Sequence, residues 1–148
     1  MAVAIQFFNS FVESMGDGSI DMDTDTFKTE LVNGYSYSAA HTQRSNWSGS
    51  ALGTGNGYTT GGASMTGTAT GWSHSGGTTT WNADDVSWTA SGGSIGPATG
   101  AVVYSDTSTN DLGVCHVDFD DGGAGTETAG DGTQFVITWN ASGIFTVS

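Results

Sequence analysis

Alternating apolar and polar residues predict short β-strands along most of the chain. From residue 134 to 139, for example, Phe135, Ile137 and Trp139 share one face. The predicted strands are residues 26–32, 78–81, 86–89, 100–104, 113–119, 134–139 and 144–147. We expect the last two strands to form a hairpin around the turn at residues 140–143, which ends in Gly143.

The N-terminal residues follow a helical period instead. Residues 4–15 predict a short helix with one apolar stripe, and Gly16 is a helix-stop residue. The stripe comprises Ile5, Phe8, Phe11, Val12 and Met15. The alternative is a strand over residues 3–8. An isolated helix must bury its apolar face, so we expect the stripe either to contact a partner or oligomer mate, or to pack on its own sheet.

Short strands separated by turns, with one helix and no strand–helix–strand rhythm, predict a mainly β protein. The expected fold is an antiparallel β-sandwich or jelly roll with one short N-terminal helix. We expect a single domain over residues 1–148, with a helical segment at 1–16 and an acidic turn at 17–25. Residues 34–77 are rich in Gly, Ser and Thr, but their interspersed aromatic residues favour short strands and loops over a linker.

Charge limits the classes of partner. The 148 residues include 15 Asp and Glu but only Lys28 and Arg44 as cations, a formal net charge of -13. Binding to nucleic acid or to anionic membranes requires cationic side chains, so we expect neither partner. Hydrophobic residues make up 36% of the chain and charged residues only 11%, which favours a folded protein over a disordered acidic one.

The remaining features show no transmembrane or disulfide pattern. There is no long apolar run that would predict a transmembrane helix and no basic leader of a signal peptide. The single cysteine, Cys115, is expected to be a buried thiol.

Two acidic clusters are candidate sites. Asp21, Asp23 and Asp25 alternate like the first ligands of a calcium loop, but Thr26 and Val32 occupy the positions that require Gly and Glu. A solvated turn is therefore the better interpretation. A second cluster, Asp118, Asp120 and Asp121, could supply a pair of catalytic carboxylates, but it is explained more simply as a strand end entering a glycine turn.

Other potential chemistry is weaker still. His41, His74 and His116 share no metal-binding spacing, and we expect His116 to face away from the core. The Gly-rich run at residues 53–57 lacks the Lys of a phosphate loop. The Trp residues are expected to build the core, with sugar stacking on Trp47, Trp72 or Trp81 as the alternative. We therefore predict no enzyme activity, no metal and no cofactor.

Several segments resemble a family of small structural proteins from tailed bacteriophages. The resemblance is carried by residues 11–18 (FVESMGDG), 23–28 (DTDTFK), 55–62 (GNGYTTGG), 88–97 (WTASGGSIGP) and 101–104 (AVVY). These matches lie in the expected order over nearly the whole chain. The predicted closing hairpin, through residues 143–147, fits as well.

The resemblance implies a virion protein with a β-sandwich fold, of the capsid decoration (cement) type. Such a protein would be made in the host bacterial cytoplasm, bind the major capsid protein on the outer surface of the head, and act as a homo-oligomer, for which we expect a trimer rather than a dimer. The alternatives are a tail or head-to-tail structural component and a carbohydrate-binding module.

Overall fold

The computed structural model describes residues 3–148, apart from the side chains of residues 69 and 70. Residues 1 and 2, which belong to the predicted helical segment 1–16, lie outside the described residues.

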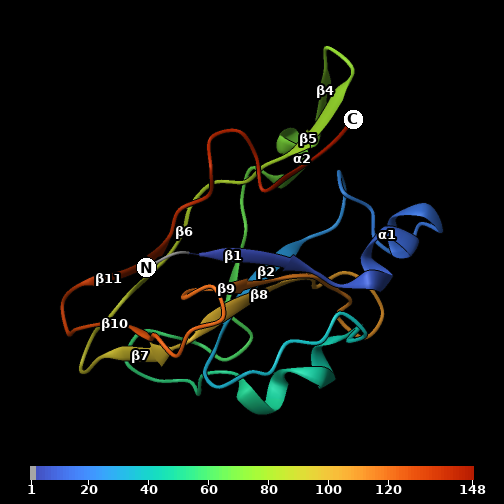
Figure 1. The fold of residues 1–148 in the computed structure, drawn as a ribbon. Helices are drawn as coiled ribbons and strands as arrows, with labels where there is room; N and C mark the ends of the chain where they lie inside the picture. The colour runs from blue at the N-terminus through green and yellow to red at the C-terminus, as the bar shows by residue number, and fades with distance from the viewer. Residues whose placement is uncertain (1–2) are drawn as a thin grey trace.

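The described chain is mainly β with antiparallel sheets (Figure 1), which confirms the predicted fold class. The strands are β1 (Ala4–Phe7), β2 (Phe27–Val32), β3 (Ala63–Ser64), β4 (Ser73–Ser75), β5 (Thr78–Trp81), β6 (Val86–Thr89), β7 (Ile95–Ala98), β8 (Gly100–Ser105), β9 (Gly113–Asp118), β10 (Glu127–Ala129), β11 (Gln134–Ile137) and β12 (Phe145–Val147). The helical segments are α1 (Asn9–Gly16), α2 (Thr68–Gly71) and two 3-10 turns, η1 (Arg44–Asn46) and η2 (Ser48–Ser50).

One layer is a five-stranded sheet in the order β1-β9-β8-β2-β3. The strands predicted at 26–32, 100–104 and 113–119 form its centre as β2, β8 and β9. Their registers place Glu30 opposite Val102 and Val102 opposite His116. Because cross-strand partners share a face, these three side chains lie on one side of the sheet and their sequence neighbours lie on the other.

The second layer is an irregular ribbon in which residues 78–89 run antiparallel to residues 134–147. Strand β6 pairs with β11, and β5 pairs with both β4 and β12. The hairpin predicted between 134–139 and 144–147 is therefore wrong. The loop between β11 and β12 faces the loop between β5 and β6: Trp139 N donates to Asp85 Oδ1 at 3.1 Å, and Ile144 N donates to Trp81 O at 2.7 Å. These hydrogen bonds connect the two loops, so the pairing of β6 with β11 continues into the pairing of β5 with β12.

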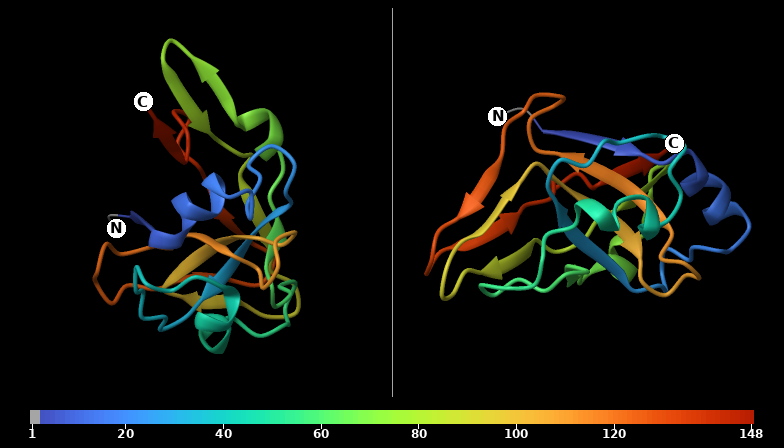
Figure 2. Two further views of the ribbon diagram at one scale, coloured as in Figure 1. Left: turned by 90° about the vertical axis from the view of Figure 1, so that its right-hand side faces the viewer. Right: turned by 90° about the horizontal axis from the view of Figure 1, so that it is seen from below.

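At one end of this ribbon, the hairpin of β4 and β5 projects away from the body of the molecule together with the C-terminal strand (Figures 1 and 2). Strands β7 and β10 form a separate two-stranded pair.

The main core lies between the sheet and the ribbon. Phe27 of β2 packs its ring against Trp81 of β5, with centroids 5.0 Å apart, and Phe119, which follows β9, meets Phe135 of β11 at 6.0 Å. Burial of these large aromatic side chains stabilises the contact between the two layers.

A second hydrophobic cluster, which the hydrophobic pattern of the sequence did not predict, covers the opposite face of the sheet. Phe8, Trp47 and residues of β2 and β8 form this cluster, beneath the long segment 33–62. The Phe8 and Trp47 rings stack with centroids 5.6 Å apart and planes 7° apart. The sheet is therefore buried on both faces, and every residue of β8 is buried.

A buried ion pair joins segment 33–62 to the sheet. Glu30 is fully buried, and Arg44 donates to both of its carboxylate oxygens, from Nε at 2.9 Å and from Nη2 at 2.7 Å. Trp47 Nε1 and Gly61 N donate to the same carboxylate at 3.1 and 2.7 Å. The hydrogen bonds from Arg44 to this carboxylate raise the pKa of the Arg44 guanidinium above its ordinary value. Four donors compensate for the burial of one negative charge.

The N-terminal helix is shorter than predicted. Residues 4–7 form β1, which pairs with β9, and the helix begins only at Asn9. The alternative of a strand over residues 3–8 is confirmed for its central part. Main-chain pairing with β9 outweighs the helical spacing of the apolar residues, because β9 offers a continuous partner from Cys115 to Asp118.

We expect Gly113→Ala to reduce the free energy of unfolding by about 1–3 kcal/mol. A Cβ at residue 113 would lie 2.6 Å from the Phe8 ring and 3.1 Å from Trp47, so the stacked pair would have to shift. Denaturant unfolding measures this loss. The matched control is Gly16→Ala, where a Cβ meets no atom within 4 Å. An equal effect of both substitutions would contradict the role of close packing at Gly113.

We expect Arg44→Met to reduce the free energy of unfolding by about 3 kcal/mol, because it leaves the Glu30 charge buried with fewer donors. The control is Lys28→Met, which removes the ion pair between Lys28 and Asp106 at 3.0 Å, both partly exposed. That loss should not exceed about 1 kcal/mol. Thermal and denaturant unfolding of the two variants compare them directly, and equal losses would contradict the structural importance of Glu30.

Candidate functional site

The five apolar residues predicted to form one contact stripe lie in different surroundings. Phe11 belongs to the main core and Phe8 to the second cluster, while Met15 packs partly buried against the main core. Val12 is 66% exposed and Ile5 is 39% exposed. The five residues therefore do not form one exposed stripe, because Phe8 and Phe11 are buried in different clusters. That Ile5 and Val12 contact a partner or an oligomer mate stays a prediction.

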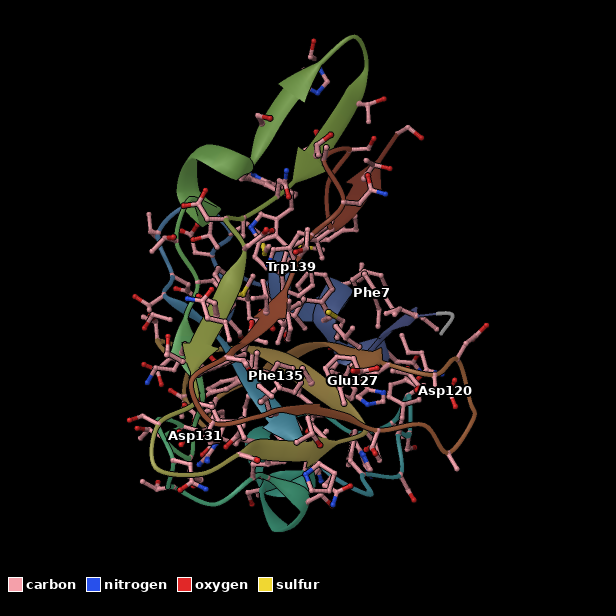
Figure 3. The ribbon with its side chains drawn as sticks, turned by 90° about the vertical axis from the view of Figure 1, so that its left-hand side faces the viewer. Phe7, Asp120, Glu127, Asp131, Phe135 and Trp139 are labelled. Carbon is pink, nitrogen blue, oxygen red and sulfur yellow. The ribbon has the colours of Figure 1, made fainter. Side chains whose placement is uncertain are left out.

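A groove of about 660 Å³ opens between the two layers, along β1 and β11. Its lining includes core residues that the ribbon and sheet do not cover completely, among them Val117 and Phe119. Figure 3 shows Phe135 of β11 and Trp139 just beyond the end of this strand, with Phe7 of β1 nearby. The full lining comprises Val3, Ile5, Val117, Phe119, Glu127, Thr128, Ala129, Gln134, Phe135, Val136, Ile137, Thr138, Trp139 and Asn140.

Exposed apolar side chains concentrate at this groove. Among the described residues, the large hydrophobic side chains that stay exposed are Val3, Ile5, Val12, Val136 and Val147. Val3, Ile5 and Val136 all line the groove, with exposed fractions of 61%, 39% and 47%. Its one charged lining residue is Glu127. An apolar surface of this kind, within an acidic molecule, is typical of an interaction site.

In both acidic clusters, aspartate side chains accept hydrogen bonds from within the chain. Asp118 accepts from the backbone N–H groups of Asp120 and Gly122 at 3.0 and 2.9 Å, and Asp120 accepts from Gly125 N at 2.7 Å. In the other cluster, Asp25 accepts from Ser105 Oγ at 2.7 Å. These contacts hold turns in place. In the part of the chain that the structure describes, no group of three or more His, Cys, Asp or Glu side chains is arranged to hold a metal ion.

Two of the three histidines meet at one tyrosine, although they are far apart in sequence. His41 Nδ1 lies 2.6 Å from the Tyr35 hydroxyl, and the His116 ring packs edge-on against Tyr35 at 5.2 Å. His116 also stacks on Tyr37 at 5.8 Å and its Nδ1 lies 3.0 Å from Gln6 Oε1. His116 lies on the face opposite Cys115, as expected, but it is buried there at 4% exposure. Burial lowers the pKa of His116, opposed by the nearby Asp118 charge.

The tryptophans and the cysteine are mainly core residues. Trp47 and Trp81 are 1% and 0% exposed, so they offer no open platform for a sugar ring, and the prediction that Trp residues build the core is confirmed for both. Trp72 is partly buried against the main core. Cys115 is a buried thiol, as predicted, and burial raises its pKa to about 12.

The motifs that carry the phage resemblance form part of the scaffold. The segments 55–62 and 88–97 lie against each other, since Ser91 N donates to Asn56 O at 3.0 Å and Asn56 Nδ2 donates to Ser94 O at 3.0 Å. Tyr58 accepts a hydrogen bond from Leu31 N at 2.9 Å. Gly62 has φ of +77°, and a Cβ there would lie 1.8 Å from Thr29 O. These residues therefore specify the fold and lie apart from the groove.

Comparison of the chain with protein-family models, with curated proteins and with solved structures finds no match. The resemblance to small phage structural proteins therefore rests on the sequence motifs. Among the helices of the described residues, none has the length and apolar character needed to cross a membrane.

We expect the protein to lose stability as the pH falls below about 6.5, the ordinary pKa of histidine. The pKa of His116 is lowered in the folded state, so the unfolded chain binds a proton first. The stabilisation by neutral His116 is thus complete above about 6.5 and declines as the pH approaches the lower folded-state pKa. The measurement is the thermal unfolding midpoint of the unmodified protein and of the His116→Gln variant, each at a series of pH values from neutral to mildly acidic. Acidic side chains titrate equally in both proteins, so any difference between the two pH profiles comes from His116. Parallel profiles would contradict its role.

Proposed function

We propose that this chain is a non-enzymatic structural protein of a tailed-phage virion, which binds the major capsid protein and decorates the outer surface of the head. The observation that carries the proposal is the apolar groove between β1 and β11 on an otherwise polar and acidic molecule. A binding surface of this kind suits a protein partner. The resemblance of residues 55–62, 88–97 and 101–104 to phage structural proteins supports the same class.

The charge of the chain also supports this location. With a net charge of -13, the protein is repelled by nucleic acid and would not compete with the shell for the packaged genome. Repulsion between acidic subunits also keeps a coat of many copies soluble before assembly.

The buried scaffold suits a mechanical role. Both faces of the central sheet are covered, so the module is rigid at its centre and contacts partners through its edges. A rigid module that bridges neighbouring shell subunits adds contact area without entering the head. In this proposal the protein acts as a homo-oligomer, with a trimer preferred over a dimer.

The test is immunogold electron microscopy of the phage particles that carry this sequence, combined with quantitative mass spectrometry of their proteins. We expect many copies distributed over the head. A few copies located at the tail would instead assign the protein to the tail or head-to-tail connector, and absence from the particle would refute a virion role. Native mass spectrometry of the purified protein tests the trimer.

A further inference from the structure

Two strand edges flank the groove, and neither has a pairing partner within the described residues on its groove side. Strand β1 pairs with β9 alone, and β11 pairs with β6 alone. Phe8 N donates to Val114 O at 3.2 Å, so alternation along the strand turns the peptide N–H and C=O of Ile5 away from β9. On the other side, Ala90 N donates to Thr133 O at 2.8 Å, and the same alternation turns the peptide groups of Val136 away from β6.

The side chains beside these edges are apolar. Ile5 lies opposite Val117 in the ladder, so its side chain lies on the main-core side of the sheet, where the two layers do not close. Val136 is exposed between the buried side chains of Phe135 and Ile137. Edge strands in natural proteins are commonly protected by Lys or Pro. These two edges carry neither, and present valine and isoleucine instead.

The surroundings of the groove are acidic. Glu127 lines it, and Figure 3 shows Asp120 and Asp131 to either side of Phe135 and Glu127 on the same face. A second copy of this chain cannot neutralise these charges. Its two cations are Lys28, paired with Asp106 at 3.0 Å, and Arg44, paired with Glu30 at 2.7 Å. The complementary occupant is therefore a different polypeptide that carries Lys or Arg.

We infer that the groove between β1 and β11 binds an extended segment of a partner protein as an added β-strand. In that segment, apolar residues alternate with polar ones and cationic residues flank them. Main-chain hydrogen bonds to the edge at Ile5 or Val136 hold the segment, its apolar side chains fill the groove, and its cations face Glu127 and the neighbouring aspartates. The inference rests on the proposed function for the identity of the partner as the shell protein, whereas the chemistry of the segment follows from the groove.

The probe is a synthetic peptide in which Val and Thr alternate and two Lys stand at each end. Isothermal titration calorimetry at low salt measures its binding to the full chain. We expect the double variant Ile5→Thr with Val136→Thr to bind about tenfold more weakly, since both walls lose apolar contact area. The matched control is Val12→Thr, which changes an exposed valine on α1 outside the groove and should bind like the unmodified protein.

Charge is tested separately. Glu127→Gln should weaken binding by about threefold at low salt and reduce its salt dependence, whereas Glu13→Gln on α1 should change neither. A peptide with Glu in place of each Lys should not bind. Hydrogen exchange should show new protection of the Ile5 or Val136 amide when the Lys peptide is bound, which a merely electrostatic association would not produce.

Several outcomes would overturn the inference: no binding of the Lys peptide, equal binding of the Glu peptide, or unchanged binding by the double groove variant. Self-association that the double variant abolishes would show that a second copy occupies the groove, and would also overturn it. Circular dichroism of each variant verifies that it is folded. Failure of the peptide experiment leaves the virion role to be decided by particle localisation, so the two proposals fail independently.

Discussion

The burial of the Glu30 carboxylate is the constraint that fixes segment 33–62 over the sheet, and the covered sheet in turn determines which surfaces stay open. The carboxylate lies on a central strand, within a sheet that already has one covered face, and every donor it receives comes from segment 33–62. An unpaired charge at this place would be costly, so the segment must remain over the sheet. The stacked rings of Phe8 and Trp47 then close the second cluster around it. The charge and its donors, together with this stack and the hydrogen bond from Leu31 N to the Tyr58 hydroxyl, hold segment 33–62 against the sheet.

Burial of both sheet faces explains where the exposed apolar surface remains. The main core covers one side and segment 33–62 covers the other, which leaves the strand edges as the open parts of the scaffold. Between β1 and β11 the two layers leave a groove. The same packing that makes the centre rigid therefore confines Val3, Ile5 and Val136 to one groove. Stability and the candidate binding surface are consequences of the same layer geometry.

The success of the strand predictions has a local cause. Alternation within residues 26–32, 100–104 and 113–119 depends on neighbouring side chains, and the structure places strands there. The helix predicted over residues 4–15 was too long, because the helical spacing of apolar residues does not reveal a competing strand partner. That partner, β9, lies more than a hundred residues later and pairs with residues 4–7. Of the candidate contact residues, Ile5 reaches the groove. The contribution of β11 could not be predicted, because it requires knowing that Val136 lies on a free edge beside β1.

The sequence by itself determined the mainly β class, the positions of the central strands, the burial of Cys115 and the strong acidity. These properties follow from composition and from contacts between residues close in the chain. The tertiary structure decided which strands pair, why Glu30 can be buried, how His41 and His116 meet at Tyr35, and where the layers remain open. Each of these depends on contacts between distant segments, whose loops are rich in glycine and carry no periodic signal. The pairing of the strands and the closure of the layers join segments that are far apart in the sequence, such as β1 with β9, so the pattern within one segment does not determine them.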